Sequence, residues 1–120
     1  MSFYSEKLVR SVRKARRCMG CCRTIEVGSS ALECAGVWEG DFWSGTYHTD
    51  CRAAELALNK LHDLYADEWM SLDDMERDDW PWLIEVFPAV AERKGITTER
   101  FNEAEAEQQR RRDAFRKARP

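Results

Sequence analysis

Hydrophobic residues near the start of the chain recur at intervals of three or four positions. Tyr4, Leu8, Val12 and Ala15 would lie along one side of a helix over residues 3–17. The other positions of this stretch are rich in Lys and Arg, which predicts either a contact with nucleic acid or another anionic partner, or a solvated helix surface. The candidate nucleic-acid-binding residues are Arg13, Lys14, Arg16 and Arg17.

Helical spacing of apolar residues returns after His48 and predicts a helix that runs to about Tyr65. Thr49 or Asp50 is the expected N-cap. The residues expected to form the inward-facing stripe of this helix are Ala53, Leu56, Ala57, Leu61 and Leu64.

Residues 31–47 have the composition of a β-hairpin. Residues 31–38 have small or β-compatible side chains, and Gly40 marks a turn before the chain returns through residues 43–47. A shorter strand is expected at residues 24–27. We interpret the dense aromatic set of the hairpin either as a small core or as anchors for a partner, since aromatic residues dominate interface hot spots. The candidate partner-binding aromatics are Trp38, Phe42 and Trp43.

Proline and glycine divide the last part of the chain into helices. Pro81 is placed for the first turn of one helix, and Pro88 ends that helix and begins another that stops at Gly95. Residues 71–74 are a plausible capping arrangement for a short helix. A last helix over about residues 97–118 has its acids early and its bases late, an order that suits the helix dipole.

These elements predict an α+β fold that is mostly helical, with a basic N-terminal helix (1–17), a small metal-binding module (18–66) and a helical C-terminal region (67–120). The 120 residues are 43% hydrophobic and 34% charged, which suits a soluble protein. No apolar run approaches the roughly 18 residues of a membrane span, and the N-terminal stretch lacks the apolar core of a signal peptide. We therefore expect a cytoplasmic protein without membrane contact.

The net charge of −3 averages two regions of opposite sign. Residues 1–23 hold seven Lys and Arg against one acid, whereas residues 63–85 hold nine Asp and Glu against one base. The acidic, Trp-containing segment is interpreted either as a surface for a cationic protein partner or as a solvated helix face. The candidate partner-binding acids are Asp73, Asp74, Asp78 and Asp79.

Two short motifs carry the strongest chemical signal. Cys18 and Cys21 form a CxxC pair, and after 26 intervening residues His48 and Cys51 form an HxxC pair. Three thiolates and one imidazole at this spacing are typical of a closed, four-coordinate zinc site with a structural role. The sequence thus predicts one structural Zn2+ per chain, against the alternative of unrelated cysteines in a reduced core. Gly20 is expected to take a left-handed conformation in the turn.

The other two cysteines fall outside this pattern. Cys22 directly follows Cys21, so its side chain is not expected to reach the same ion, although it remains the alternative ligand. Cys34 is expected to be a small buried hydrophobic residue.

The order of knuckle, hairpin and helix, with CxxC first and Tyr-His-x-x-Cys last, resembles a treble-clef zinc finger of the poly(ADP-ribose) polymerase type or the first half of a LIM domain. The resemblance covers about residues 18–60 and implies Cys18, Cys21, His48 and Cys51 as the zinc ligands. The stretch from Gly36 to Gly45, ahead of the HxxC pair, is similar to small uncharacterised proteins of phages and prophages. That second resemblance implies a phage context and the cytoplasm of the host.

Once the four metal ligands are assigned, the remaining residues do not form a catalytic set. His62 is the one remaining side chain that acts as a base near neutral pH, and no Gly-rich phosphate loop is present. We therefore predict a protein that is not an enzyme. One hypothesis is a zinc-stabilised protein-binding module, a phage-encoded and anti-CRISPR-like inhibitor of a host defence complex. The alternative is a zinc finger protein that binds nucleic acid through the basic N-terminal helix.

Overall fold

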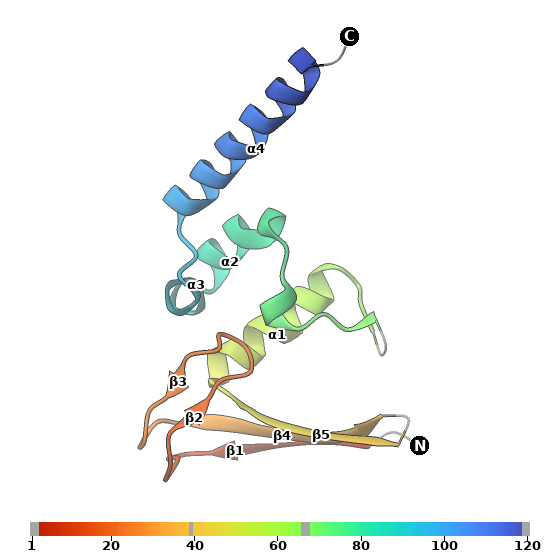
Figure 1. Cartoon of the computed structure of the whole chain (residues 1–120). Helices are drawn as coiled ribbons and strands as arrows, with labels where there is room; N and C mark the ends of the chain where they lie inside the picture. The colour runs from red at the N-terminus through yellow and green to blue at the C-terminus, as the bar shows by residue number, and fades with distance from the viewer. Residues whose placement is uncertain (1–2, 39, 66–67, 119–120) are drawn as a thin grey trace. The chain divides into compact units, whose positions relative to one another are not determined.

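The computed structural model describes residues 3–38, 40–65 and 68–118 (Figure 1). The chain forms two compact units, Met1–Met75 and Glu76–Pro120. Strands are found in the first unit, and roughly half of the chain is helical. The predicted α+β class is confirmed: the strands and a Cys/His cluster lie in the N-terminal part, and the C-terminal half is helical.

The first unit is built on a three-stranded antiparallel sheet in the order β1-β4-β5 and a two-stranded sheet of β2 and β3. The strands are β1 (Phe3–Val9), β2 (Arg16–Arg17), β3 (Thr24–Ile25), β4 (Ala31–Trp38) and β5 (Asp41–Tyr47). The predicted hairpin is confirmed as β4 and β5, which pair from Leu32 with Tyr47 to Trp38 with Asp41.

The helix predicted over residues 3–17 is wrong. The first part of this stretch is strand β1, which pairs with β4 from Phe3 with Val37 to Val9 with Ala31. Tyr4 and Leu8 are four residues apart, and this spacing places two side chains on one side of a strand as well as on one side of a helix. The edge of β4 favours the strand, because the backbone N–H and C=O groups of β1 form hydrogen bonds with it.

Helix α1 (Thr49–Leu61) is confirmed, but it ends earlier than predicted and buries a different face. Leu56 is 43% exposed and Leu61 is 52% exposed, although both belong to the stripe expected to face inward. His48, not Thr49 or Asp50, occupies the N-cap position, and no side chain caps the helix there. The buried residues of α1 are Cys51, Arg52, Ala54, Glu55, Leu58 and Asn59.

The second unit contains short helices followed by one long one. They are the 3-10 helix η3 (Arg77–Asp79), α2 (Trp80–Val86), α3 (Pro88–Lys94) and α4 (Thr98–Ala118). Pro81 and Pro88 lie in the first turns of α2 and α3, and Gly95 ends α3 with a left-handed φ of 72°, as predicted. Leu83 and Val90 are fully buried, whereas no residue of α4 is.

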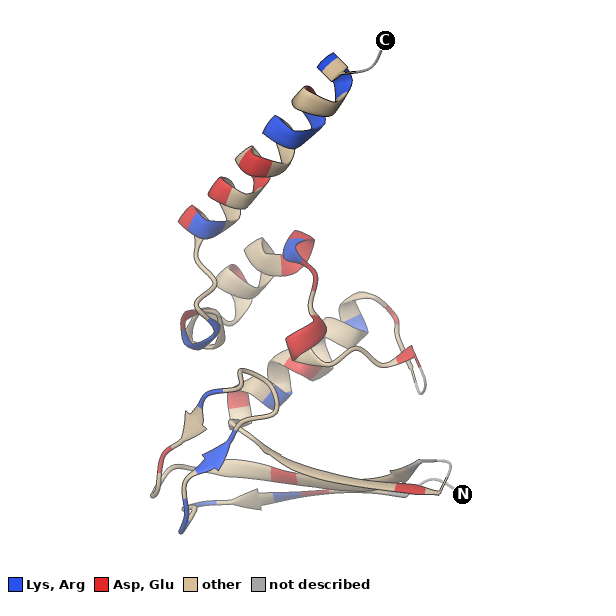
Figure 2. Cartoon of the chain, in the orientation of Figure 1, with Lys and Arg blue, Asp and Glu red and all other residues tan. Residues whose placement is uncertain are grey.

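Charged residues are unevenly distributed within each unit (Figure 2). Lys and Arg gather on β2 and in the loop that leads to it, while α4 has acidic residues in its first half and basic residues in its second half. None of the described helices is both long and apolar enough to cross a membrane.

Candidate metal centre and basic groove

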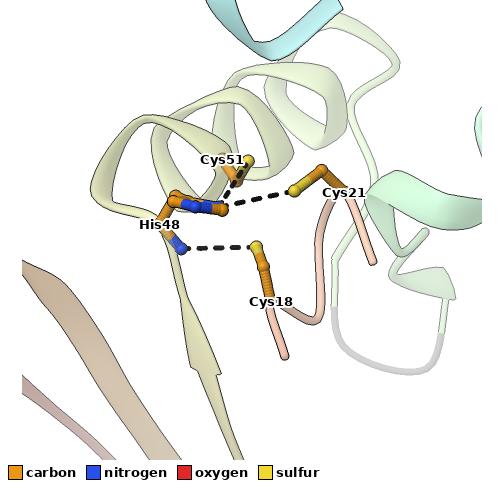
Figure 3. A group of neighbouring side chains, drawn as sticks. All are labelled: Cys18, Cys21, His48 and Cys51. Atoms are coloured by element: carbon orange, nitrogen blue, oxygen red, sulfur yellow. Dashed lines mark hydrogen bonds between the residues drawn. The ribbon is translucent and has the colours of Figure 1, made fainter. Parts of the chain in front are cut away.

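The four residues of the CxxC and HxxC pairs converge on one point of the first unit (Figure 3). The Sγ atoms of Cys18, Cys21 and Cys51 and a ring nitrogen of His48 all lie within 4.8 Å of one another. His48 Nδ1 is 3.4 Å from Cys21 Sγ and 3.8 Å from Cys51 Sγ. Within the described residues this is the single group of three or more His, Cys, Asp or Glu side chains arranged in this way.

The two distances from His48 Nδ1 to the cysteine sulfurs fit a metal ion of zinc's size. With Zn–S bonds of about 2.3 Å and Zn–N bonds of about 2.0–2.1 Å, the edges of a tetrahedral site are about 3.5–3.8 Å long. The three cysteines are at most 5% exposed, as expected for a closed structural site. The predicted Cys3His cluster is therefore confirmed as a group that could hold an ion such as zinc.

Each ligand pair is positioned by a neighbouring element. Cys18 directly follows β2, and its backbone N–H donates to Arg23 O at 2.9 Å, closing the turn that carries Cys21. Met19 N donates to Thr46 O at 2.9 Å, which ties this turn to β5. His48 comes immediately after β5, and Cys51 lies in the first turn of α1.

The surroundings of Cys18 favour its thiolate. The side chain of Cys51 and the backbone N–H groups around Cys18 lower the pKa of Cys18 to about 4, although burial acts in the opposite direction. Two of these donors are the N–H groups of Gly20 and His48, each 3.3 Å from Cys18 Sγ. A metal-binding cysteine must be deprotonated, so these donors prepare the site for a cation.

The turn of the first ligand pair differs from the prediction in one detail. Gly20 does not take a positive φ; the left-handed residue is Cys22, with a φ of 63°. A glycine is instead needed here because a side chain would not fit: an added Cβ would lie 2.9 Å from Cys51 Cβ and 3.2 Å from Leu72 Cδ2. The turn therefore packs tightly against the first turn of α1.

Neither Cys22 nor Cys34 belongs to the cluster. Cys22 Sγ is directed to Asp73 Oδ1 at 3.6 Å, so its place as an alternative ligand is not supported. Cys34 is buried as predicted, but its surroundings are polar: Sγ lies 3.7 Å from Glu6 Oε1 and 3.8 Å from the Tyr4 hydroxyl. Burial raises the pKa of Cys34.

A buried ionic network that the sequence analysis did not single out lies beside the metal centre. Arg52 Nη1 donates to Glu55 Oε2 at 2.6 Å, Nε to Glu6 Oε1 at 3.3 Å, and Nη2 to the Tyr4 hydroxyl at 2.6 Å. The Arg52 guanidinium also lies 5.2 Å from the ring centre of Tyr47 and 5.6 Å from that of Trp69. Arg52 thereby joins β1, β5 and α1 with the segment that follows α1.

Glu55 and Asn59 extend this network to the segment that follows α1. Glu55 is 1% exposed and accepts hydrogen bonds from Leu72 N at 2.9 Å and from the Tyr47 hydroxyl at 3.0 Å. The Asn59 side chain accepts from Met70 N and donates to Met70 O, both at 2.8 Å. Local sequence could not identify these residues, because their partners are far away along the chain.

The candidate partner-binding residues are placed in different surroundings. Phe42 is 70% exposed. Trp43 lies 5.9 Å from Tyr4, ring centre to ring centre, and points to the opposite face of the sheet from Phe42. The side chain of Trp38 lies outside the described residues. Of the acids, Asp73 and Asp74 belong to the 3-10 helix η2 (Leu72–Asp74) of the first unit.

The other two candidate acids, Asp78 and Asp79, belong to η3 of the second unit. Asp74 accepts a hydrogen bond from the Ser71 hydroxyl at 2.9 Å, and Asp73 is the carboxylate that Cys22 contacts. The role of these acids in partner binding stays a prediction.

The candidate nucleic-acid-binding cations line two adjoining hollows of the first unit, about 730 Å³ and about 380 Å³ in volume. Arg16, Lys7 and Glu33 line both hollows, Arg17 lines the larger one, and Arg13 and Lys14 line the smaller one. We call these five cations and Glu33 the basic groove. Four of these cations are the candidates predicted from the sequence, but the helix expected to carry them does not form.

Comparison with protein-family models, with curated proteins and with solved structures gives no match to this chain. The site geometry therefore carries the functional argument.

Proposed function

We propose that this chain is a zinc-stabilised module, without enzymatic activity, that binds nucleic acid in the basic groove. The observation that carries the proposal is the charge of the groove, in which five cations are accompanied by one acid, Glu33. Clustered Lys and Arg side chains neutralise phosphates and release their counterions, which is the dominant source of affinity for nucleic acid.

The proposed metal is one structural Zn2+ in a treble-clef arrangement. The turn between β2 and β3 supplies Cys18 and Cys21, and the junction of β5 with α1 supplies His48 and Cys51. Four protein ligands leave no coordination position for a substrate or a water molecule, which is typical of structural rather than catalytic zinc.

The metal centre and the groove are coupled through β2. Arg16 and Arg17 directly precede Cys18, and the hydrogen bond from Met19 N to Thr46 O fixes the same segment to β5. An ion bound at Cys18 would therefore hold the two arginines beside β5, whose residues Ser44, Gly45 and Thr46 line the larger hollow.

The basic groove is favoured over the acidic segment as the functional surface. Its cations line continuous hollows within one unit, whereas the four candidate acids divide between the two units. A host protein as the partner of those acids, and with it an inhibitory role in a phage, stays a prediction.

Reversing the charge of Arg16 and Arg17 together, as in R16E/R17E, should weaken binding to a fluorescent 12-nucleotide DNA by about 10-fold or more. The slope of log K against log salt should also become shallower by about 1.4, because each phosphate contact of a single strand contributes about 0.7. Both side chains are exposed, so the fold should survive the change. Fluorescence anisotropy at several salt concentrations measures both quantities.

The matched control is R111E/R112E on α4, which makes the same change of charge outside the groove. It should leave the affinity close to that of the unaltered protein. An equal loss of affinity in the two double variants would show that binding depends on overall charge, and it would contradict a site in the groove. The variant E33Q, which removes the acid of the groove, should strengthen binding.

A further inference from the structure

The sheet presents an open face that continues the basic groove. Because residues paired across neighbouring strands share a face, Lys7, Glu33 and Thr46 form one row across β1, β4 and β5. Ser5, Ala35 and Ser44 form the next row, and both rows line the larger hollow. This face is therefore a recess with cations at one end and the small side chains of Ser5, Ala35 and Ser44 along its floor.

Phe42 lies on this same face, one row beyond the hollow. It pairs with Val37, two residues along from the row of Ala35 and Ser44, so its side chain points to the same side of the sheet. Phe42 is 70% exposed, and it lies about 13 Å along β5 from Thr46 at the usual rise of a strand. The open face thus combines cations at one end with an exposed aromatic ring at the other.

The opposite face of the sheet is already occupied. Tyr4 and Trp43 stack there, and Glu6, Cys34 and Tyr47 contact Arg52 of α1 or its hydrogen-bond partners. Phe42 takes no part in this packing, so its exposure is not explained by the interior of the unit.

We infer that the open face binds single-stranded nucleic acid, with the backbone along the cations of the basic groove and a base stacked on Phe42. This inference rests on the proposed function and specifies its ligand. An aromatic ring stacks on any unpaired base, whereas the bases of a duplex present only their edges in the grooves. The groove is also a recess that receives a strand, while readers of the duplex insert a protruding helix or ribbon into the major groove.

Three variants of Phe42 and Phe115, together with R16E/R17E and two probes, test this inference. The probes are a 12-nucleotide single-stranded DNA and the corresponding 12-base-pair duplex, each titrated at low salt. The unaltered protein should bind the single strand more tightly than the duplex. Phe42→Ala should weaken binding of the single strand by about 5- to 150-fold, the range that loss of one base-stacking contact gives. Its salt slope should not change, because no charge is removed.

Phe42→Tyr should restore the affinity, since the ring is kept. The matched control is Phe115→Ala on α4, which removes the same side chain at 67% exposure and should have little effect. Unchanged single-strand affinity in Phe42→Ala, or tighter binding of the duplex, would overturn the inference. If R16E/R17E still weakened binding by about 10-fold or more in that case, the proposed function would stand. Absence of binding to both probes by the unaltered protein would contradict both.

Discussion

Protein carrying Cys21→Ala is expected to contain no zinc and to lose the fold of Met1–Met75. A structural zinc contributes an apparent binding free energy of about 10–16 kcal/mol to a small domain, while whole domains are stable by only about 5–15 kcal/mol. Losing the ion therefore removes as much free energy as folding provides. The same result is expected for His48→Ala, because the four candidate ligand atoms lie within 4.8 Å of one another and could hold one ion together.

The control for this experiment is Cys22→Ala, which removes the neighbouring thiol outside the cluster. It should keep its zinc and its fold. Zinc content by atomic emission and the dispersion of amide signals in NMR spectra report the two properties separately for each variant. Metal-free Cys21→Ala protein that unfolds at the same temperature as the unaltered chain would show that the cluster is not a structural metal site.

The second largest effect is expected at the buried ion pair of Arg52 and Glu55. Arg52→Met should lower the free energy of unfolding by about 3–5 kcal/mol, because it leaves a buried carboxylate without its cation. Glu55 would keep hydrogen bonds from Leu72 N and the Tyr47 hydroxyl, and burial raises the pKa of Tyr47, so that hydroxyl remains a donor. Urea unfolding in the presence of zinc measures the change.

Two further variants separate the ion pair from ordinary loss of packing. Adding Glu55→Gln to Arg52→Met should recover part of the lost stability, since it removes the unpaired charge. Arg111→Met breaks the solvent-exposed contact of Arg111 with Glu107 and should change the stability far less. A loss from Arg52→Met no larger than that from Arg111→Met would contradict a structural role for the network.

The features predicted correctly are those that a few neighbouring residues determine. The ligand pairs are three residues apart, so one turn suffices to direct both side chains to one ion. Pro81, Pro88 and Gly95 act through their own backbone conformation, and the predicted limits of α2 and α3 agree with the structure for that reason.

The features predicted wrongly depend on partners that are distant along the chain. Strand β1 exists because β4 lies beside it, and the four-residue spacing of Tyr4 and Leu8 fits a strand as well as a helix. The inward face of α1 is fixed by Cys51 at the metal centre, and Arg52 is buried because Glu6 and Tyr4 are brought to it. Leucines at 56 and 61 are consequently left at the surface.

The residues of the basic groove could be predicted from the sequence only in part. Its cations could be identified from the sequence, because Lys and Arg cluster locally. Lys7 could not be added to them without the register of the sheet, which places it in the row of Glu33 and Thr46. The same register separates Phe42 from Trp43, which are neighbours in the sequence but lie on opposite faces.

The proposed zinc ion, which would hold the first unit together and position the basic groove, is bound by three sulfur atoms and one nitrogen atom. X-ray absorption at the zinc edge of the purified protein tests this most directly. The predicted result is three sulfur ligands at about 2.3 Å and one nitrogen ligand at about 2.0–2.1 Å. A shell of four sulfur atoms, which would bring in Cys22 or Cys34, or a shell containing oxygen, would contradict it.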